Sequence, residues 1–204
     1  MDLLTHLSLS LKLKRHIENN FHIKVNTFRF MWGNIKPDLS PQYAHIPHYK
    51  KDSGSFICQE IKTLLETRLS ENKPCTGHFS ERLGITTHYL SDFFCYAHSE
   101  GFTGGNVRHT LYELRISLYF LFRFLKINRL NSEYNNSNQS ISTIWQTIEE
   151  LHANYSQWAD KAQPSIDIAF TLKSCSYLCF SVMATCITDE EDAYGIDELV
   201  HSLN

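Results

Sequence analysis

Two adjacent stretches, HYLSDFFCYAH at residues 88–98 and HTLYE at residues 109–113, constrain the fold of this chain most strongly. The first has the pattern H-x3-D-x5-H and the second the pattern H-x3-E. On an α-helix, side chains four residues apart lie on one face, where both can reach a single metal ion. The stretches therefore predict two helices, joined by a glycine-rich turn, that hold a clustered multi-metal site. The candidate ligands are His88, Asp92, His98, His109 and Glu113.

Helix geometry divides these ligands between ions. A helix rises 1.5 Å per residue, so His88 and His98 would lie ~15 Å apart on a straight helix, whereas zinc–ligand bonds are ~2 Å long. The two residues should therefore serve different ions. With His109 and Glu113, His98 forms a set of two His and one carboxylate, typical of hydrolytic zinc sites that leave a position for water. The pair of His88 and Asp92 needs further ligands.

Such ligands occur upstream. Prolines at positions 37, 41 and 47 predict a loop over residues 34–47. Asp38 lies in this loop, His48 follows it, and His6 lies near the chain start. Each of these groups also has an ordinary interpretation, as a surface ion pair, a turn residue, a loop His or a His at a helix C-terminus. The other histidines are assigned to the surface or the core: His16, His22, His45, His78, His152 and His201.

Composition favours a single globular domain over residues 1–204. The chain is 42% hydrophobic and has a net charge of −3, with no basic run beyond Lys50–Lys51. We therefore expect neither nucleic-acid binding nor a stable membrane anchor. The first residues lack the features of a signal peptide, which predicts a cytoplasmic location. The six cysteines should be free and mostly buried, including Cys175 and Cys179.

Apolar residues recur with helical spacing along the whole chain, and no strand pattern is apparent. The fold class is therefore all-α, a multi-helix bundle. A stretch rich in Asn and Ser over 131–142 predicts a mobile loop. The apolar segment Ile166–Ile187 contains Asp167 and Lys173, which favours a buried helix over a membrane span. The expected helices cover 3–21, 25–32, 53–69, 76–97, 106–130, 144–159 and 165–188.

The motifs together resemble the zinc-dependent phospholipase C family, which includes the bacterial phosphatidylcholine-hydrolysing enzymes and the clostridial alpha-toxin. The resemblance covers about residues 5–115. It implies the helical bundle that these enzymes share with single-strand-specific nucleases. Glu113 favours the phospholipase side, because the nucleases carry H-x3-D at that place. The matching elements, in order, are Thr5–His6, Pro37–Asp38, His48, the H-x3-D-x5-H of residues 88–98 and the H-x3-E of residues 109–113.

The resemblance also implies a distribution of zinc ions. Asp38, His48, His88 and Asp92 would hold one ion. His98, His109 and Glu113 would hold a second. His6 and a bridging Asp92 would hold a third, for which exported members also use the amino group of an N-terminal Trp, whereas this chain begins with Met1. Two zinc ions are therefore expected and a third is possible, although His and carboxylate ligands also accept iron or manganese.

Three functions agree with this sequence. The first is a phospholipase C-type hydrolase that cleaves a phospholipid between glycerol and phosphate, with Asp38 orienting or deprotonating the attacking water. The second is a zinc-binding protein of the same fold with little or no catalysis. The third is a nuclease or soluble phosphodiesterase, which the net charge and Glu113 disfavour. The phospholipid head group and the oligomeric state have no sequence signal.

Overall fold

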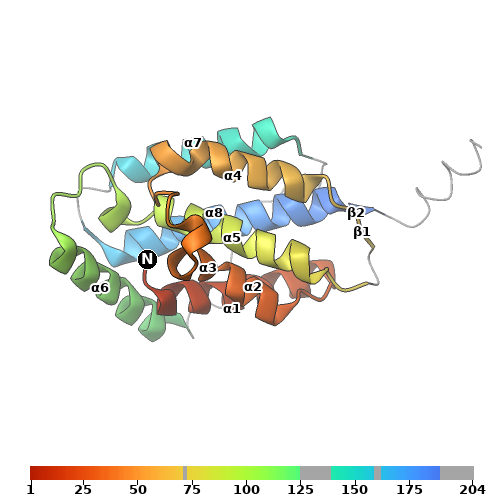
Figure 1. Ribbon diagram of the computed structural model, residues 1–204, viewed down its shortest axis with the longest axis horizontal. Coiled ribbons are helices and arrows are strands. Elements are labelled where there is room, and N and C mark those ends of the chain that lie inside the picture. Colours follow the sequence, from red (N-terminus) through yellow and green to blue (C-terminus); the bar gives the residue numbers. More distant parts are fainter. Residues whose placement is uncertain (71–72, 125–138, 159–161, 189–204) are drawn as a thin grey trace, which may run out of the picture.

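The computed structural model describes residues 1–70, 73–124, 139–158 and 162–188, and within them the chain is an all-α bundle (Figure 1). The expected fold class is confirmed. Two short 3-10 helices, η1 (Pro41–Tyr43) and η2 (Tyr96–His98), interrupt the connections. The α-helices of the described residues are α1 (Leu3–Phe21), α2 (Thr27–Gly33), α3 (Lys36–Leu39), α4 (Lys50–Leu65), α5 (Gly77–Phe93), α6 (Asn106–Phe124), α7 (Ile141–Ser156) and α8 (Pro164–Cys186).

Helices α5 and α8 form the centre of the bundle. Figure 1 shows them side by side, with α4 and α7 above, α1 and α2 below, and α6 at one end. The side chain of Thr76 caps α5 by accepting a hydrogen bond from the Phe79 amide. Every residue of α5 from Leu83 to Phe93 is buried. The two candidate ligands on α5 therefore lie inside the bundle.

The crossing of α2 and α5 is unusually close because it is made by glycines. A Cβ atom placed on Gly84 would lie 2.9 Å from the Cα atom of Gly33 and closer still to the carbonyl oxygen of Phe30. Real Cβ atoms essentially never approach that closely. Only glycine allows the two backbones to meet in this way. The contact holds the C-terminal end of α2 directly against the helix that bears His88.

Several predicted boundaries differ from the observed ones. Helix α5 ends at Phe93 rather than Ala97. The segment 34–47, expected to be a loop, contains two short helices. They are α3, which has Pro37 in its first turn, and η1. Of the expected mobile loop over 131–142, residues 131–138 lie outside the described residues. Its last two residues, 141 and 142, belong to α7, whose N-cap is Ser140. A two-residue parallel strand pair, β1 (Leu69–Ser70) with β2 (Ile187–Thr188), was not anticipated.

Helix α8 is the one described helix that is long and apolar enough, by composition, to cross a membrane. In the structure 67% of its apolar window is buried inside the bundle, as in the core helix of a folded domain. The expectation of a buried helix is therefore confirmed. All six cysteines are free; five are buried and Cys58 is partly exposed.

Candidate metal centre

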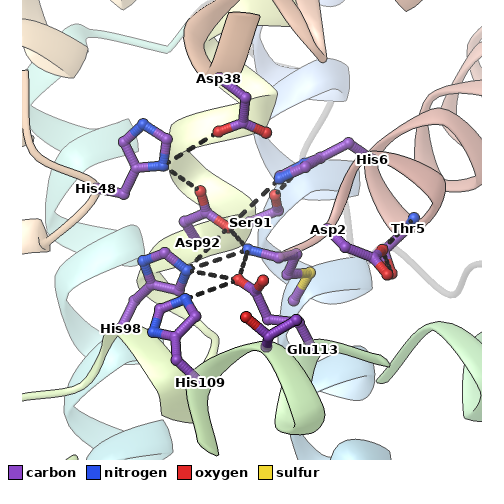
Figure 2. Close-up of polar contacts among 12 residues, drawn as sticks. Asp2, Thr5, His6, Asp38, His48, Ser91, Asp92, His98, His109 and Glu113 are labelled. Carbon is purple, nitrogen blue, oxygen red and sulfur yellow. Dashed lines mark hydrogen bonds and ion pairs between the residues drawn. The ribbon is translucent and has the colours of Figure 1, made fainter. Parts of the chain in front are cut away.

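All eight side chains that the sequence singles out converge at one place, where the ends of several elements meet. Figure 2 labels all of them except His88. They form four overlapping groups, and in each group one ligand atom per residue lies within 4.8 Å of the others. The groups are His6, His88 and Asp92; Asp38, His48 and His88; His48, Asp92 and His98; and His98, His109 and Glu113.

Asp92 lies at the centre of the cluster. It is fully buried on α5, one turn after His88, and its Oδ2 atom lies 3.5 Å from the Nε2 atom of that residue. From the loop before α4, the Nδ1 atom of His48 lies 3.0 Å from the same oxygen. From α1, the Nε2 atom of His6 lies 3.5 Å from Oδ1. One carboxylate thus faces imidazoles from three separate segments.

His98 lies closer to this centre than a straight helix would allow. Because α5 ends at Phe93 and the chain turns back through η2, the Nε2 atom of His98 comes within 4.0 Å of Asp92 Oδ1. His98 therefore belongs to two groups, one around Asp92 and one on α6. In the second group its Nε2 lies 3.1 Å from Oε1 of Glu113, and the Nε2 atom of His109 lies 3.0 Å from the same oxygen. The separation of ligands into distinct ions, expected from helix rise, is thus less complete than predicted.

The hydrogen bonds of two imidazoles leave their inner nitrogens free to bind a cation. A carbonyl only accepts, so His88 donates its Nδ1–H to the Asn34 carbonyl, at 2.8 Å. The hydroxyl of Ser91 donates to the His88 carbonyl at 2.7 Å, so its oxygen accepts from Nδ1 of His6, at 3.2 Å. Both Nε2 atoms are then unprotonated in the neutral rings, and both are buried with no hydrogen-bond partner. Buried bare nitrogens beside a carboxylate fit a metal site, with Asn34 and Ser91 as orienting partners.

The cluster is closed on one side and open on the other. His6, His88 and Asp92 are fully buried. The side chains of Asp38 and His109 are 25% and 29% exposed. A water or an ester can therefore approach from the side of these two residues. Beside His98 lies a pocket of about 400 Å³, whose lining includes Tyr49, Lys50 and Lys51.

The α-amino group of Met1 also lies in the cluster, which sequence analysis missed. It pairs with Asp92 and lies 3.2 Å from both Nε2 of His98 and Oε1 of Glu113. Burial alone would lower its pKa, but Asp92, Cys95 and Glu113 act together in the opposite direction, Asp92 most strongly, and the pKa rises to about 12. An ammonium group thus supplies a positive charge where the carboxylates converge. This nitrogen would bind a metal only after losing its proton.

Burial and charge shift the pKa values of the ligands themselves. Burial lowers the pKa of His98 to about 4, and the neighbouring amino group acts in the same direction. The pKa of His88 falls well below its usual value, chiefly through burial. Burial opposes ionisation of Asp92, yet the surrounding amino group and imidazoles hold its pKa well below the usual range. Burial also opposes the charged form of His48, but its hydrogen bond to Asp92, together with the charges of Asp92 and Asp38, outweighs burial and raises its pKa. Neutral His88 and His98 beside an ionised Asp92 are the protonation states that metal binding requires.

A second buried carboxylate, Asp167 on α8, binds residues close in sequence to the candidate metal ligands. The sequence did not predict it as part of the centre. It accepts hydrogen bonds from the Tyr96 amide at 2.9 Å, the Tyr112 hydroxyl at 2.9 Å and the Tyr155 hydroxyl at 3.0 Å. Tyr96 begins the turn that carries His98, and Tyr112 precedes Glu113. One side chain therefore ties α6, α7 and η2 to α8. The sequence signal that could have indicated this role is a single Asp within a largely apolar helix.

Comparison with known proteins agrees with this geometry. The family model for zinc-dependent phospholipase C matches residues 5–162, more than the span of the motifs alone. The chain belongs to the zinc-dependent phospholipase C family. The family match reaches through α7, so it includes every element that contributes a ligand. A search of curated proteins and a search of solved structures each found no match.

Proposed function

We propose that this protein is a phospholipase C-type phosphodiester hydrolase that cleaves a phospholipid between glycerol and phosphate, with two zinc ions and a possible third. The observation that carries the proposal is the convergence of eight His, Asp and Glu side chains around Asp92, with bare buried nitrogens on His6 and His88. Asp38, His48, His88 and Asp92 would hold one ion, and His98, His109 and Glu113 a second. His6 with Asp92 would serve the third. Bound zinc would supply the charge that neutralises a phosphodiester and acidifies water.

Asp38 is the residue we assign to the attacking water. Its carboxylate belongs to the open side of the cluster, with Oδ1 3.6 Å from both Nδ1 of His48 and Nε2 of His88. Burial raises the pKa of Asp38, which makes it a stronger base than an ordinary aspartate. Its carboxylate takes the water proton as the water oxygen bonds to phosphorus. The bond from phosphorus to the glycerol oxygen then breaks, that oxygen takes a proton from solvent as diacylglycerol leaves, and Asp38 returns its own proton to solvent.

The pocket beside His98 is the proposed place for the rest of the substrate. Its rim carries Lys50, which pairs with Glu149 at 2.6 Å, and Lys51, which lies 3.6 Å from Glu100. These two carboxylates balance the charge of the ammonium groups, so a phosphate ester in the pocket would exchange with them as the partner of the lysines. The aromatic walls of Tyr49, Phe93 and Tyr155 offer apolar contact next to it.

Three substrates separate the candidate functions. Zinc-loaded protein is assayed on short-chain phosphatidylcholine, on a soluble aryl phosphodiester and on single-stranded DNA. Release of diacylglycerol and phosphocholine supports the proposal. Hydrolysis of DNA alone would assign a nuclease, and metal binding with no turnover on any substrate would assign a non-catalytic zinc protein.

A further inference from the structure

Helix α6 has two faces of different chemistry, and only the inner one belongs to the metal centre. His109 and Glu113 point into the cluster, and Tyr112, Ile116 and Phe120 are at most 4% exposed. The outer face is a stripe of exposed apolar side chains spaced by four, three, four and three residues, followed by one more. These residues, here called the α6 stripe, are Val107, Leu111, Leu114, Leu118, Leu121 and Phe122.

The α6 stripe is more apolar than an ordinary surface. Each of its side chains is at least 47% exposed, and Phe122 reaches 76%. Scattered exposed apolar residues are normal, but a continuous row along one helix marks an interaction surface. Figure 1 shows α6 at one end of the bundle, where its outer face is free of the other described helices.

The charges that flank the α6 stripe identify the kind of partner. At 100° per residue, Arg108 and Arg115 follow one another along the same edge of the stripe. Among the described residues neither guanidinium forms an ion pair. The only acidic residue of α6 is Glu113, which lies in the metal centre. The partner must therefore supply both apolar surface and negative charge.

A pocket joins the two features. It has a volume of about 350 Å³, and its lining includes Phe102, Arg108, Leu111 and Arg115. Its walls thus combine two guanidinium groups with an apolar side chain of the α6 stripe. Guanidinium groups bind phosphate through paired hydrogen bonds. The pocket therefore suits a lipid phosphate whose acyl chains continue along the stripe.

We propose that the outer face of α6 docks on a bilayer that contains anionic phospholipids. An apolar face with arginines along its edge is the pattern of a helix that lies in the membrane interface. A second copy of the chain fits less well, because an antiparallel pairing of two stripes would set arginines against arginines with no acidic residue to compensate them. The docking itself does not depend on the proposed function. Its consequence does: a docked helix would deliver phospholipid to the metal ligands on its inner face, and this rests on the proposed function.

Sedimentation with vesicles tests the docking. Zinc-loaded protein is mixed with vesicles of phosphatidylcholine containing about a third phosphatidylserine, and with pure phosphatidylcholine vesicles. The turnover variant Asp38→Asn is measured in parallel, so that lipid hydrolysis does not consume the vesicles. We expect binding to the anionic vesicles that weakens with salt. Equal binding to both vesicle types, or none to the anionic ones, would overturn the proposal.

Matched variants locate the surface. Phe122→Ser should weaken vesicle binding about tenfold or more, because the ring no longer enters the lipid. Phe28→Ser, on α2 and 75% exposed in the wild type, should have no effect. Arg108→Gln with Arg115→Gln should weaken binding about 30-fold. These three variants should unfold at temperatures similar to that of the wild type, because the altered side chains lie at the surface.

Two further readouts separate the possible failures. Light scattering that shows a dimer dissociated by Phe122→Ser, without vesicle binding, would assign the stripe to a second copy and overturn the proposal. Hydrolysis of soluble short-chain phospholipid without vesicle binding would overturn the docking and leave the proposed function intact. Vesicle binding without hydrolysis of any phospholipid would overturn the proposed function and leave the docking intact.

Discussion

The Nδ1 atom of His88 lies 2.8 Å from the backbone carbonyl oxygen of Asn34, so the end of α2 orients an imidazole of the metal centre. Asn34 is the C-cap residue of α2, and its own side chain donates to the Phe30 carbonyl at 3.0 Å. The close crossing of α2 and α5 at Gly33 and Gly84 keeps this carbonyl in place. Helix packing outside the cluster thus decides which nitrogen of His88 faces the other candidate ligands.

The first prediction concerns this crossing. Gly84→Ala should lower the free energy of unfolding by about 3 kcal/mol, because the new methyl group meets backbone atoms of α2 that cannot give way. It should also weaken zinc binding through His88. Gly105→Ala is the matched control, since nothing lies within 4 Å of a Cβ atom placed there. Denaturant unfolding and zinc titration measure both effects, and equal stability of the two variants would contradict the assigned crossing.

The second prediction concerns catalysis. Asp38→Asn should retain most of the zinc but lose nearly all turnover, because an amide takes no proton from water. Asp52→Asn, an exposed acidic residue in the first turn of α4, serves as the control. Metal content by mass spectrometry and phospholipid hydrolysis are the measurements. Full activity of the Asp38 variant would remove this residue from the mechanism.

The third prediction concerns the number of ions. The double variant His109→Ala, Glu113→Ala should contain about one zinc fewer per chain than the wild type, because it removes two of three ligands from one group. His45→Ala with Glu66→Ala removes the same residue types outside the four groups and should leave the zinc content unchanged. Protein purified without chelator is analysed by mass spectrometry. Unchanged zinc in the double variant would exclude an ion between α6 and η2.

The fourth prediction concerns the orienting partner of His6. Ser91→Ala removes the oxygen that accepts from Nδ1 of His6, so the ring can rotate or change tautomer. We expect the affinity for the zinc bound through His6 to fall about 10- to 100-fold. Ser174→Ala, which removes a hydroxyl from a fully buried serine on α8, is the control. Competition with a chromogenic chelator reports the affinity, and similar curves for both variants would rule out this role.

The fifth prediction concerns the pH dependence of stability. Burial raises the pKa of Asp167 from 3.8 to about 6 in the folded chain, despite the three hydrogen bonds that favour its charged form. The folded state therefore holds the proton more tightly than the unfolded state. This gain is fully present below pH 4 and is lost as the pH rises through 6. Between pH 8 and pH 5, the wild type should gain on the order of 1 kcal/mol over Asp167→Asn.

Urea unfolding of both proteins, in the same zinc buffer at each pH, isolates this effect, because the other titrating groups are common to both. The difference between the two free energies of unfolding is the quantity to follow. A difference that stays constant from pH 8 to pH 5 would mean that Asp167 is ionised throughout that range.

The sequence was enough to predict the all-α class, the eight clustered side chains and the family. Apolar periodicity and spacing along one helix, as for His88 and Asp92, are local properties. His6, Asp38 and His48 lie on other segments, and they joined the ligand set through the resemblance to the family. The family match bears out the resemblance over a longer span than the motifs covered. The cytoplasmic location stays a prediction.

Tertiary structure decided what depends on contacts between distant segments. Which nitrogen of His88 and of His6 faces the other candidate ligands follows from hydrogen bonds to Asn34 and Ser91, which lie far from these histidines in the chain. The approach of His98 to Asp92 follows from the end of α5 at Phe93, a boundary that apolar periodicity alone does not mark. From the sequence, the segment 106–130 could only be predicted to be a helix, without a division of its apolar residues into buried and exposed ones. Only the packing of that helix showed that Leu114 and Leu118 stay about half exposed, because burial is a property of the assembled bundle.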